Sequence, residues 1–210
     1  MTGAPFDPSR TALLIVDLQN DFLHPEGAYA RGGQANADIA ALPDRVLPVA
    51  EALRRAGGWI VSTQFTLVPG KGGQPFISPH LKRLRPFLGQ GDFAPGAWGH
   101  ALVDPLQPAD ITVEKVAYSA FYMTRMEWVL RKAGIDTLIL CGIVTNGGVA
   151  STLRDAHVRD FSLYLLTDGC AAFSREVHET SIRDLSTIAE PVTCADMEIE
   201  IGVAGKRPPS

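Results

Sequence analysis

The sequence predicts an α/β protein, a single-domain three-layer α/β/α sandwich in which an open, mostly parallel sheet of six strands has helices on both faces. Two observations carry this prediction. Short apolar runs alternate with helical patterns along the chain, as in repeated strand–helix–strand units. The strongest apolar runs also lack polar alternation, which indicates strands buried on both faces, as is typical of parallel sheets.

Six segments have the composition of strands, four of them strongly apolar and two weaker. In an open sheet of this class the carboxyl ends of the strands hold the ligand site, so the residues just after each run are the first candidates for function. The strong runs are 11–19 (TALLIVDLQ), 58–65 (GWIVSTQF), 136–143 (DTLILCGI) and 161–169 (FSLYLLTDG), and the weaker runs are 110–115 (DITVEK) and 191–197 (PVTCADM).

Helical patterns occupy the intervals between these runs. The patterns at 38–57 and 125–134 each end on a glycine, and the pattern at 174–188 opens on a serine that can cap a helix. The segment 66–109 interrupts the alternation of predicted strands and helices, because it is rich in Gly, Pro and aromatic residues without a regular period. A long irregular loop in a compact domain is usually functional, so we expect it to fold over the site. The domain is expected to span 11–200, with an N-terminal extension at 1–10 and a C-terminal tail at 201–210.

Composition excludes several classes of protein. With 46% hydrophobic and 20% charged residues the chain has the profile of a soluble globular protein. No apolar run approaches the roughly 18 residues of a membrane span. A net charge of −4 without a basic run disfavours a nucleic-acid partner. The start MTGAPFDPSR lacks the pattern of a secretory signal, so a cytoplasmic location is expected.

The cysteines indicate neither a disulfide framework nor a metal site. Cys141, Cys170 and Cys194 are widely spaced, and each lies in or just after an apolar run, where a thiol behaves as a small hydrophobic group. The histidines form no metal-binding motif either. We therefore expect three buried free thiols, no metal and no cofactor.

Two charged residues end predicted strands. Asp17 follows the apolar run ALLIV, so its carboxyl group is expected to lie where the strand is still buried. Burial raises the pKa of a carboxyl group and a nearby cation lowers it, which makes Asp17 a candidate for acid or base chemistry. Lys115 ends the run ITVEK, and the same geometry would direct its ammonium group towards Asp17.

A polar turn with two glycines, TNGG, follows the most apolar strand. Thr145 or Asn146 can cap the helix that begins near Gly147, and free backbone N–H groups at a helix start can receive an anion or an oxyanion. Gly147 and Gly148 would let a substrate approach the backbone closely. A merely flexible turn is the alternative.

Aromatic and loop residues complete the expected site. Trp98, Tyr118 and Phe121 would supply an aromatic wall, although such residues more often belong to a core. His178 is expected on the surface of a helix. The residues expected to contact substrate are Gln64, Trp98, Tyr118, Phe121, Val144, Thr145, Asn146 and Gly147.

These segments together resemble the isochorismatase-like hydrolase superfamily, with a Rossmann-like fold, over nearly the whole chain from Thr11 to Met197. The resemblance rests on LLIVDLQNDF, on the stretch from KVAYSAFYMT to TLRDAHVRDF, and on EVHETSI. Members resemble one another in a triad of Asp, Lys and Cys, and Asp17 and Lys115 match its first two positions. The cysteine position of the resemblance falls on Gly148, so the nucleophile of the amidase branch is missing.

Isochorismatases proper are similar in having glycine at that position. The resemblance therefore implies hydrolysis of a vinyl ether in a small carboxylated substrate, with Asp17 as the general acid, Lys115 orienting it and no covalent intermediate. Val144 and Asn146 replace the aromatic residue and the histidine of the isochorismatase turn. The residues TQFTL at 63–67 also lack the D-x-H metal motif of nicotinamidases.

Two alternatives remain. The chain can be a C–N (amide or carbamoyl) hydrolase homologue whose catalytic cysteine is replaced by Gly148, naturally or by engineering, so that it binds its substrate without turnover. It can also be a non-catalytic small-molecule binding protein. Lys82, Arg83 and Arg85 are candidates for binding a substrate carboxylate. The resemblance further implies a homodimer or homotetramer.

Overall fold

A computed structural model describes residues 6–205 and contains one six-stranded sheet in the order β3-β2-β1-β4-β5-β6. Every neighbouring pair of strands is parallel. The predicted sheet is therefore confirmed, and each strand lies within or close to its predicted run. The strands are β1 Thr11–Val16, β2 Trp59–Phe65, β3 Ile111–Lys115, β4 Thr137–Ile143, β5 Ser162–Ala171 and β6 Glu190–Val192.

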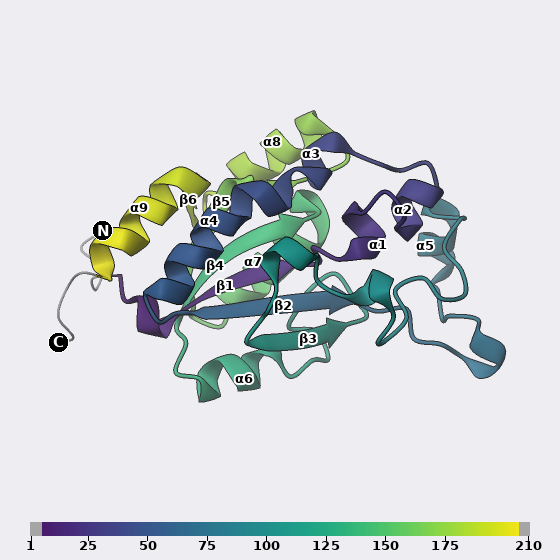
Figure 1. The fold of residues 1–210 in the computed structure, drawn as a ribbon, viewed down its shortest axis with the longest axis horizontal. Coiled ribbons are helices and arrows are strands. Elements are labelled where there is room, and N and C mark those ends of the chain that lie inside the picture. The colour runs from purple at the N-terminus through teal and green to yellow at the C-terminus, as the bar shows by residue number, and fades with distance from the viewer. Residues whose placement is uncertain (1–5, 206–210) are drawn as a thin grey trace.

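Helices cover both faces of the sheet and form two hydrophobic cores with it. On one face α4 and α9 lie side by side (Figure 1), and leucine, isoleucine and valine side chains from these helices and from β1 fill the space between. On the other face α6, α7 and α8 pack against alternate residues of the same strands. The helices are α3 Ala37–Ala40, α4 Leu42–Arg55, α6 Met126–Lys132, α7 Ala150–His157, α8 Arg175–Leu185 and α9 Cys194–Ala204.

The carboxyl-terminal end of the chain differs from the expectation. The sixth strand stops at Val192, because Thr193 accepts a hydrogen bond from the Asp196 amide and so starts α9 inside the segment predicted as strand. The helix then continues through Ala204, beyond the expected boundary at 200, since Ile201 is fully buried against the sheet. Residues 1–5 of the expected extension and 206–210 of the expected tail lie outside the described residues.

The order of the strands reverses between β1 and β4, and in open α/β sheets the carboxyl ends of the strands at such a point are where ligands bind. Gly142 in β4 allows the two strands to approach there. Its φ is 119°, and a Cβ atom at this position would lie 2.1 Å from the carbonyl oxygen of Val16. A side chain at residue 142 would therefore separate the strands at the point where the site forms.

Most of the segment 66–109, including α5 Pro79–Leu84, lies with α1 Asn20–Leu23 and α2 Ala28–Arg31 beyond the arrowheads of β1 to β3 (Figure 1). Its last residues run back past α4 to the start of β3. A small satellite core that includes Tyr29, Leu88 and Phe93 holds these pieces together. The buried carboxylate of Asp21 joins them as well, because it accepts hydrogen bonds from the amides of Ala28 (2.9 Å) and Phe93 (2.7 Å). None of the helices within residues 6–205 is both long enough and apolar enough to cross a membrane.

Replacing Asp21 with alanine should lower the free energy of unfolding by about 3 kcal/mol, since two charge-assisted hydrogen bonds to buried amides are lost together. Chemical denaturation of Asp21→Ala and of the unaltered protein measures this difference. The exposed Glu26 on the same loop is a matched control, and Glu26→Ala should change the value by no more than about 0.5 kcal/mol. Equal losses in the two variants would contradict the role of Asp21.

Candidate active site

Four adjacent strands each contribute to one cluster at the carboxyl edge of the sheet. Lys115 is the last residue of β3, Thr63 lies near the end of β2, Asp17 directly follows β1, and Gly148 lies in the turn after β4. Thr63 and Lys115 share a face because each lies two residues after a core residue of that face, Val61 and Val113. The parallel register therefore brings polar groups together from segments far apart in the sequence.

A buried ion pair forms the centre of this cluster. The Nζ atom of Lys115 lies 2.6 Å from Oδ2 of Asp17, and the two side chains are only 2% and 6% exposed. The Thr63 hydroxyl donates a hydrogen bond to Oδ1 of Asp17 (2.7 Å), and Lys115 also donates to the carbonyl oxygen of Ala117 (3.0 Å). Asp17 has a φ of 57°, a left-handed conformation that aspartate tolerates better than most residues. Sequence reasoning missed Thr63, whose alternating position in β2 was the available signal.

Opposing influences act on the ionisation of Asp17. Burial raises the pKa of this carboxyl group above its ordinary value, while Lys115, Thr63 and the backbone amide of Phe65 counteract that rise. The Lys115 ammonium group also lies over the Phe65 ring, with Nζ 5.7 Å from the ring centroid. The site thus holds a proton-accepting carboxylate in a place where water is excluded, which suits acid–base work.

Gly148 lies directly against this pair. It belongs to a single turn of π-helix, Thr145–Val149, which precedes α7. A Cβ atom at Gly148 would lie 3.3 Å from Oδ2 of Asp17 and 2.8 Å from the carbonyl oxygen of Ile143. Any side chain at this position would therefore project into contact with the carboxylate.

The turn is held by a side chain that the sequence did not indicate. Thr145 does not cap the following helix, and instead its hydroxyl is 2.8 Å from Nδ1 of His178 in α8. His178 lies on a helix and is partly exposed, as expected, and its ring also contacts the turn. Burial lowers the pKa of this imidazole, with the Thr167 backbone, Glu179 and Asp38 opposing the shift and Arg175 adding to it.

Two expected substrate-binding residues lie away from Asp17, and this corrects the expectation. Gln64 points to the opposite face of the sheet from Thr63, because side chains alternate along a strand, and its Nε2 donates to Ser62 Oγ (3.0 Å). Phe121 belongs to the hydrophobic core, where its ring packs on Phe161 at a centroid distance of 6.0 Å.

The other expected contact residues lie around the turn or in the 66–109 segment. Tyr118 is 60% exposed and close to the turn, since a Cβ atom at Gly147 would lie 3.5 Å from its ring. Asn146 is exposed and Val144 is half-buried. Trp98 is half-exposed and packs edge to face on His24. Their contacts with substrate stay predictions.

The three cysteines do not supply a substitute nucleophile. All three are free and buried. Burial raises the pKa of Cys170 to about 12 and raises those of Cys141 and Cys194 as well, so the reactive thiolate is scarce. Among residues 6–205 there is also no cluster of three or more His, Cys, Asp or Glu side chains placed to hold a metal ion.

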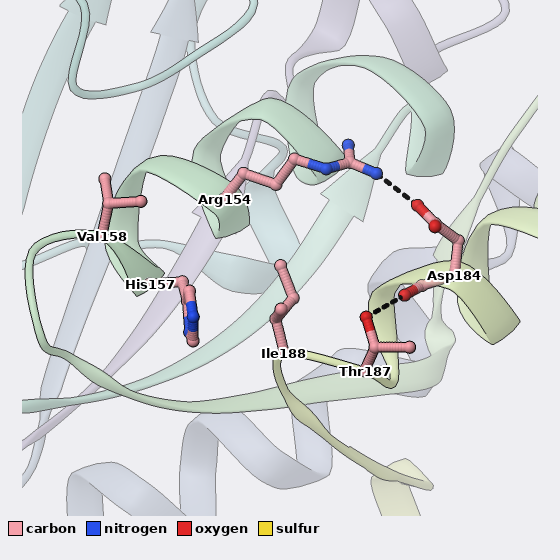
Figure 2. Close-up of a pocket in the computed structure, with 6 residues that line it drawn as sticks. All are labelled: Arg154, His157, Val158, Asp184, Thr187 and Ile188. Atoms are coloured by element: carbon pink, nitrogen blue, oxygen red, sulfur yellow. Dashed lines mark hydrogen bonds and ion pairs between the residues drawn. The ribbon is translucent and has the colours of Figure 1, made fainter.

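Two surface hollows lie outside this cluster. One, of about 250 Å³, lies between α7 and the end of α8, where Arg154 pairs with Asp184 beside His157 (Figure 2). The other, of about 330 Å³, is lined by charged residues of α3, α4 and α8 and includes His178. Neither is lined by Asp17, Lys115 or Gly148, so the ion pair and its turn remain the candidate active site.

Removing the cation of the pair should destabilise the protein strongly. Lys115→Met leaves a buried carboxylate without its partner, which costs about 3–5 kcal/mol of unfolding free energy. The double variant Lys115→Met, Asp17→Asn should recover most of that loss, because no buried charge remains. Denaturant titrations of the four members of this cycle measure the coupling, and the exposed Lys132→Met serves as control. Additive losses would contradict the ion pair.

The half-buried imidazole of His178 predicts a pH dependence. Folding lowers the pKa of His178 below its unfolded value of about 6.5. At a pH between the folded and the unfolded pKa, the unfolded chain therefore binds more protons than the folded chain. The free energy of unfolding should therefore rise as the pH rises through that window. His178→Gln should show a smaller rise between about pH 5 and pH 7 than the unaltered protein. Part of the rise should persist, because burial lowers the pKa of His100 as well.

The sequence of the chain is similar to those of known hydrolases. Residues 11–197 match the model of the Isochorismatase domain family. The chain is 36% identical over 194 residues to a ureidoacrylate amidohydrolase RutB of Methylorubrum extorquens, covering 87% of this chain and 78% of that protein. It is 35% identical over 175 residues to RutB of Caulobacter vibrioides, covering 78% of each.

Two solved structures of related hydrolases have the same fold. A cysteine hydrolase from Pseudomonas syringae superposes with a TM-score of 0.81 at 25% identity, over 97% of this chain and 100% of the other. N-carbamoylsarcosine amidase from Thermoplasma acidophilum superposes with a TM-score of 0.69 at 25% identity, over 88% and 96%.

These comparisons overturn the expected vinyl-ether hydrolysis. The curated relatives are named amidohydrolases, which cleave C–N bonds, and this favours the amidase alternative. The glycine at position 148 alone was not a sufficient reason to assign ether chemistry. The chain belongs to the isochorismatase-like cysteine hydrolase superfamily.

Proposed function

We propose that this protein is a C–N hydrolase homologue that binds a small amide, carbamoyl or ureido compound against Asp17 and Lys115, and in which Gly148 replaces the nucleophile. The observation that carries the proposal is the contact between the ion pair and the turn. The Cβ position of Gly148 lies 3.3 Å from Oδ2 of Asp17, where a thiol side chain would meet its base. The amidohydrolase names of the relatives support the same class of bond.

The geometry is suited to nucleophilic attack on a carbonyl carbon. A thiol at position 148 could give its proton to Asp17 and attack the C–N carbonyl, and Asp17 could then return the proton to the departing amine. Lys115 would stabilise the Asp17 carboxylate before the first transfer and after the second, when Asp17 carries its negative charge. The π-helical turn lies at the same place, and the N–H groups of Gly147 and Val149 in it donate to the carbonyl oxygen of Val144. Its other backbone N–H groups are the ones suited to binding the oxyanion.

Without the thiol, the site has the groups proposed to bind the substrate but no nucleophile to attack it. Asp17 already contacts Lys115 and Thr63 through its two oxygens, and the buried cysteines lie elsewhere with raised pKa values. We therefore propose that the protein as it stands holds such a compound without forming a covalent intermediate. Ureidoacrylate and N-carbamoyl amino acids are the natural first compounds to test, given the names of the relatives.

Restoring the thiol should create amidase activity. For Gly148→Cys we expect kcat/KM on at least one member of a panel of ureido, carbamoyl and amide acids to rise at least about a thousandfold above the unaltered protein, since loss of a nucleophile typically costs that much or more. Ammonia release measures the rate. Mass spectrometry of Gly148→Cys during turnover detects the acyl adduct on its thiol.

Gly148→Ala is the matched control, because it places the same Cβ atom 2.8 Å from the Ile143 carbonyl oxygen and adds no nucleophile. It should show no gain. If Gly148→Cys folds, as judged by circular dichroism, and hydrolyses nothing in the panel, the proposed function is wrong.

A further inference from the structure

The side chain of Thr145 links the π-helical turn to α8. Thr145 is the first residue of the turn and is fully buried, and its Oγ1 atom lies 2.8 Å from Nδ1 of His178. The carbonyl oxygen of the same residue accepts a hydrogen bond from the amide of Ala150, which closes the turn around Gly148. A movement of Thr145 therefore moves the backbone that carries Gly148.

The position of Gly148 leaves little room for such a movement. A Cβ atom on this residue would lie 2.8 Å from the carbonyl oxygen of Ile143 and 3.3 Å from Oδ2 of Asp17. Sites that depend on contacts this close are sensitive to displacements of about 1 Å. The bond that fixes Thr145 therefore also fixes the geometry between the turn and the ion pair.

The hydrogen bond between Thr145 and His178 fits a neutral imidazole. The hydrogen of a buried hydroxyl group needs an acceptor, and Nδ1 of His178 is placed to be that acceptor when the ring carries its proton on Nε2. The hydrogen bond of the ring with the Thr167 backbone agrees, because it raises the pKa of the imidazole and so is one in which the ring donates. A second proton would turn Nδ1 into a donor and leave the Thr145 hydroxyl hydrogen without this acceptor.

Protons reach this imidazole through a hollow at the surface. His178 is half-buried and lines the hollow of about 330 Å³. Burial is the largest influence on the pKa of His178 and lowers it, so the ring is neutral at about pH 7 and gains its proton in acid. The other charged or titratable groups that face the hollow come from α3, α4, β5 and α8, and they are Asp38, Arg45, Asp168, Cys170, Arg175 and Glu179.

We propose that His178 is a positioning residue of the candidate active site. As a neutral imidazole it accepts the Thr145 hydroxyl hydrogen and holds the turn with Gly148 against Asp17, and protonation from the hollow releases the turn. A ligand at Asp17 and Gly148 should therefore bind more weakly in acid. This consequence for the ligand rests on the proposed function, whereas the hold on the turn does not.

Nuclear magnetic resonance tests the hold on the turn without a ligand. In protein with isotope-labelled glycine and histidine, the amide signals of Gly147 and Gly148 should shift with pH at the midpoint of the His178 ring. Thr145→Val should abolish this shift although the ring still titrates, and Thr145→Ser should retain it, because serine keeps the hydroxyl group. His157→Gln changes an exposed imidazole of α7 and should leave the shift as it is.

His178→Gln separates the imidazole from Asp17, whose carboxyl group also titrates close to Gly148. The shift that has the midpoint of the His178 ring should be lost in this variant, and a shift that persists there comes from another group. The inference is wrong if the glycine signals of the unaltered protein do not follow the ring, or if they follow it equally in Thr145→Val.

Isothermal titration calorimetry with N-carbamoylglycine tests the consequence for a ligand. The measurements are made at about pH 7.5 and at about one pH unit below the midpoint of the His178 ring, and the ligand carboxyl group, with a pKa of about 3.5, stays mostly ionised. The unaltered protein should bind at least about fivefold more weakly at the lower pH. Both His178→Gln and Thr145→Val should lose this pH dependence.

The outcomes separate this inference from the proposed function. If N-carbamoylglycine binds equally well at the two pH values, the consequence for the ligand is wrong. If it does not bind and Gly148→Cys hydrolyses another compound, that compound takes its place. If nothing binds and Gly148→Cys hydrolyses nothing, the proposed function fails, and the glycine signals still decide the hold on the turn. Circular dichroism of each variant shows whether the fold is kept, and Thr145→Ser gives the reading should His178→Gln not fold.

Discussion

The buried ion pair between Asp17 and Lys115 is the constraint on which the rest of the site depends. Each charge would be costly alone at 2–6% exposure, so both strands that bear them must stay in register with β2 between them. Thr63, from that middle strand, contacts the remaining carboxylate oxygen. The parallel sheet and the two cores that cover it therefore do more than provide stability, because they hold a proton-accepting carboxylate where solvent does not reach.

Gly148 changes what this carboxylate can do. In a superfamily of cysteine hydrolases, the position beside the ion pair would hold a thiol, and here the same backbone turn presents a bare Cα. The three thiols of the chain lie within the hydrophobic layers with raised pKa values and cannot take that role. The site thus keeps its ion pair and its turn, the parts to which we assign the binding of a ligand.

The charged groups of the site and the loops beyond them are held in different ways. The chemical groups lie at the ends of rigid strands, where packing sets their positions closely. The loops and short helices are instead tied together by the buried carboxylate of Asp21, which accepts hydrogen bonds from the amides of Ala28 and Phe93. Such a division lets the loops vary with the ligand while the strands retain the reactive groups, as is common in open α/β folds.

The sequence alone determined the strand pattern, the fold class and the two charged members of the site, because Asp17 and Lys115 directly end apolar runs and strand ends meet at one edge of a parallel sheet. Only the tertiary structure decided which face each side chain takes and what it touches. It turned Gln64 away from Asp17, placed Phe121 in the core, brought Thr63 to the carboxylate and joined His178 to Thr145. These contacts link residues far apart in the chain, and they depend on packing between layers that no local pattern records.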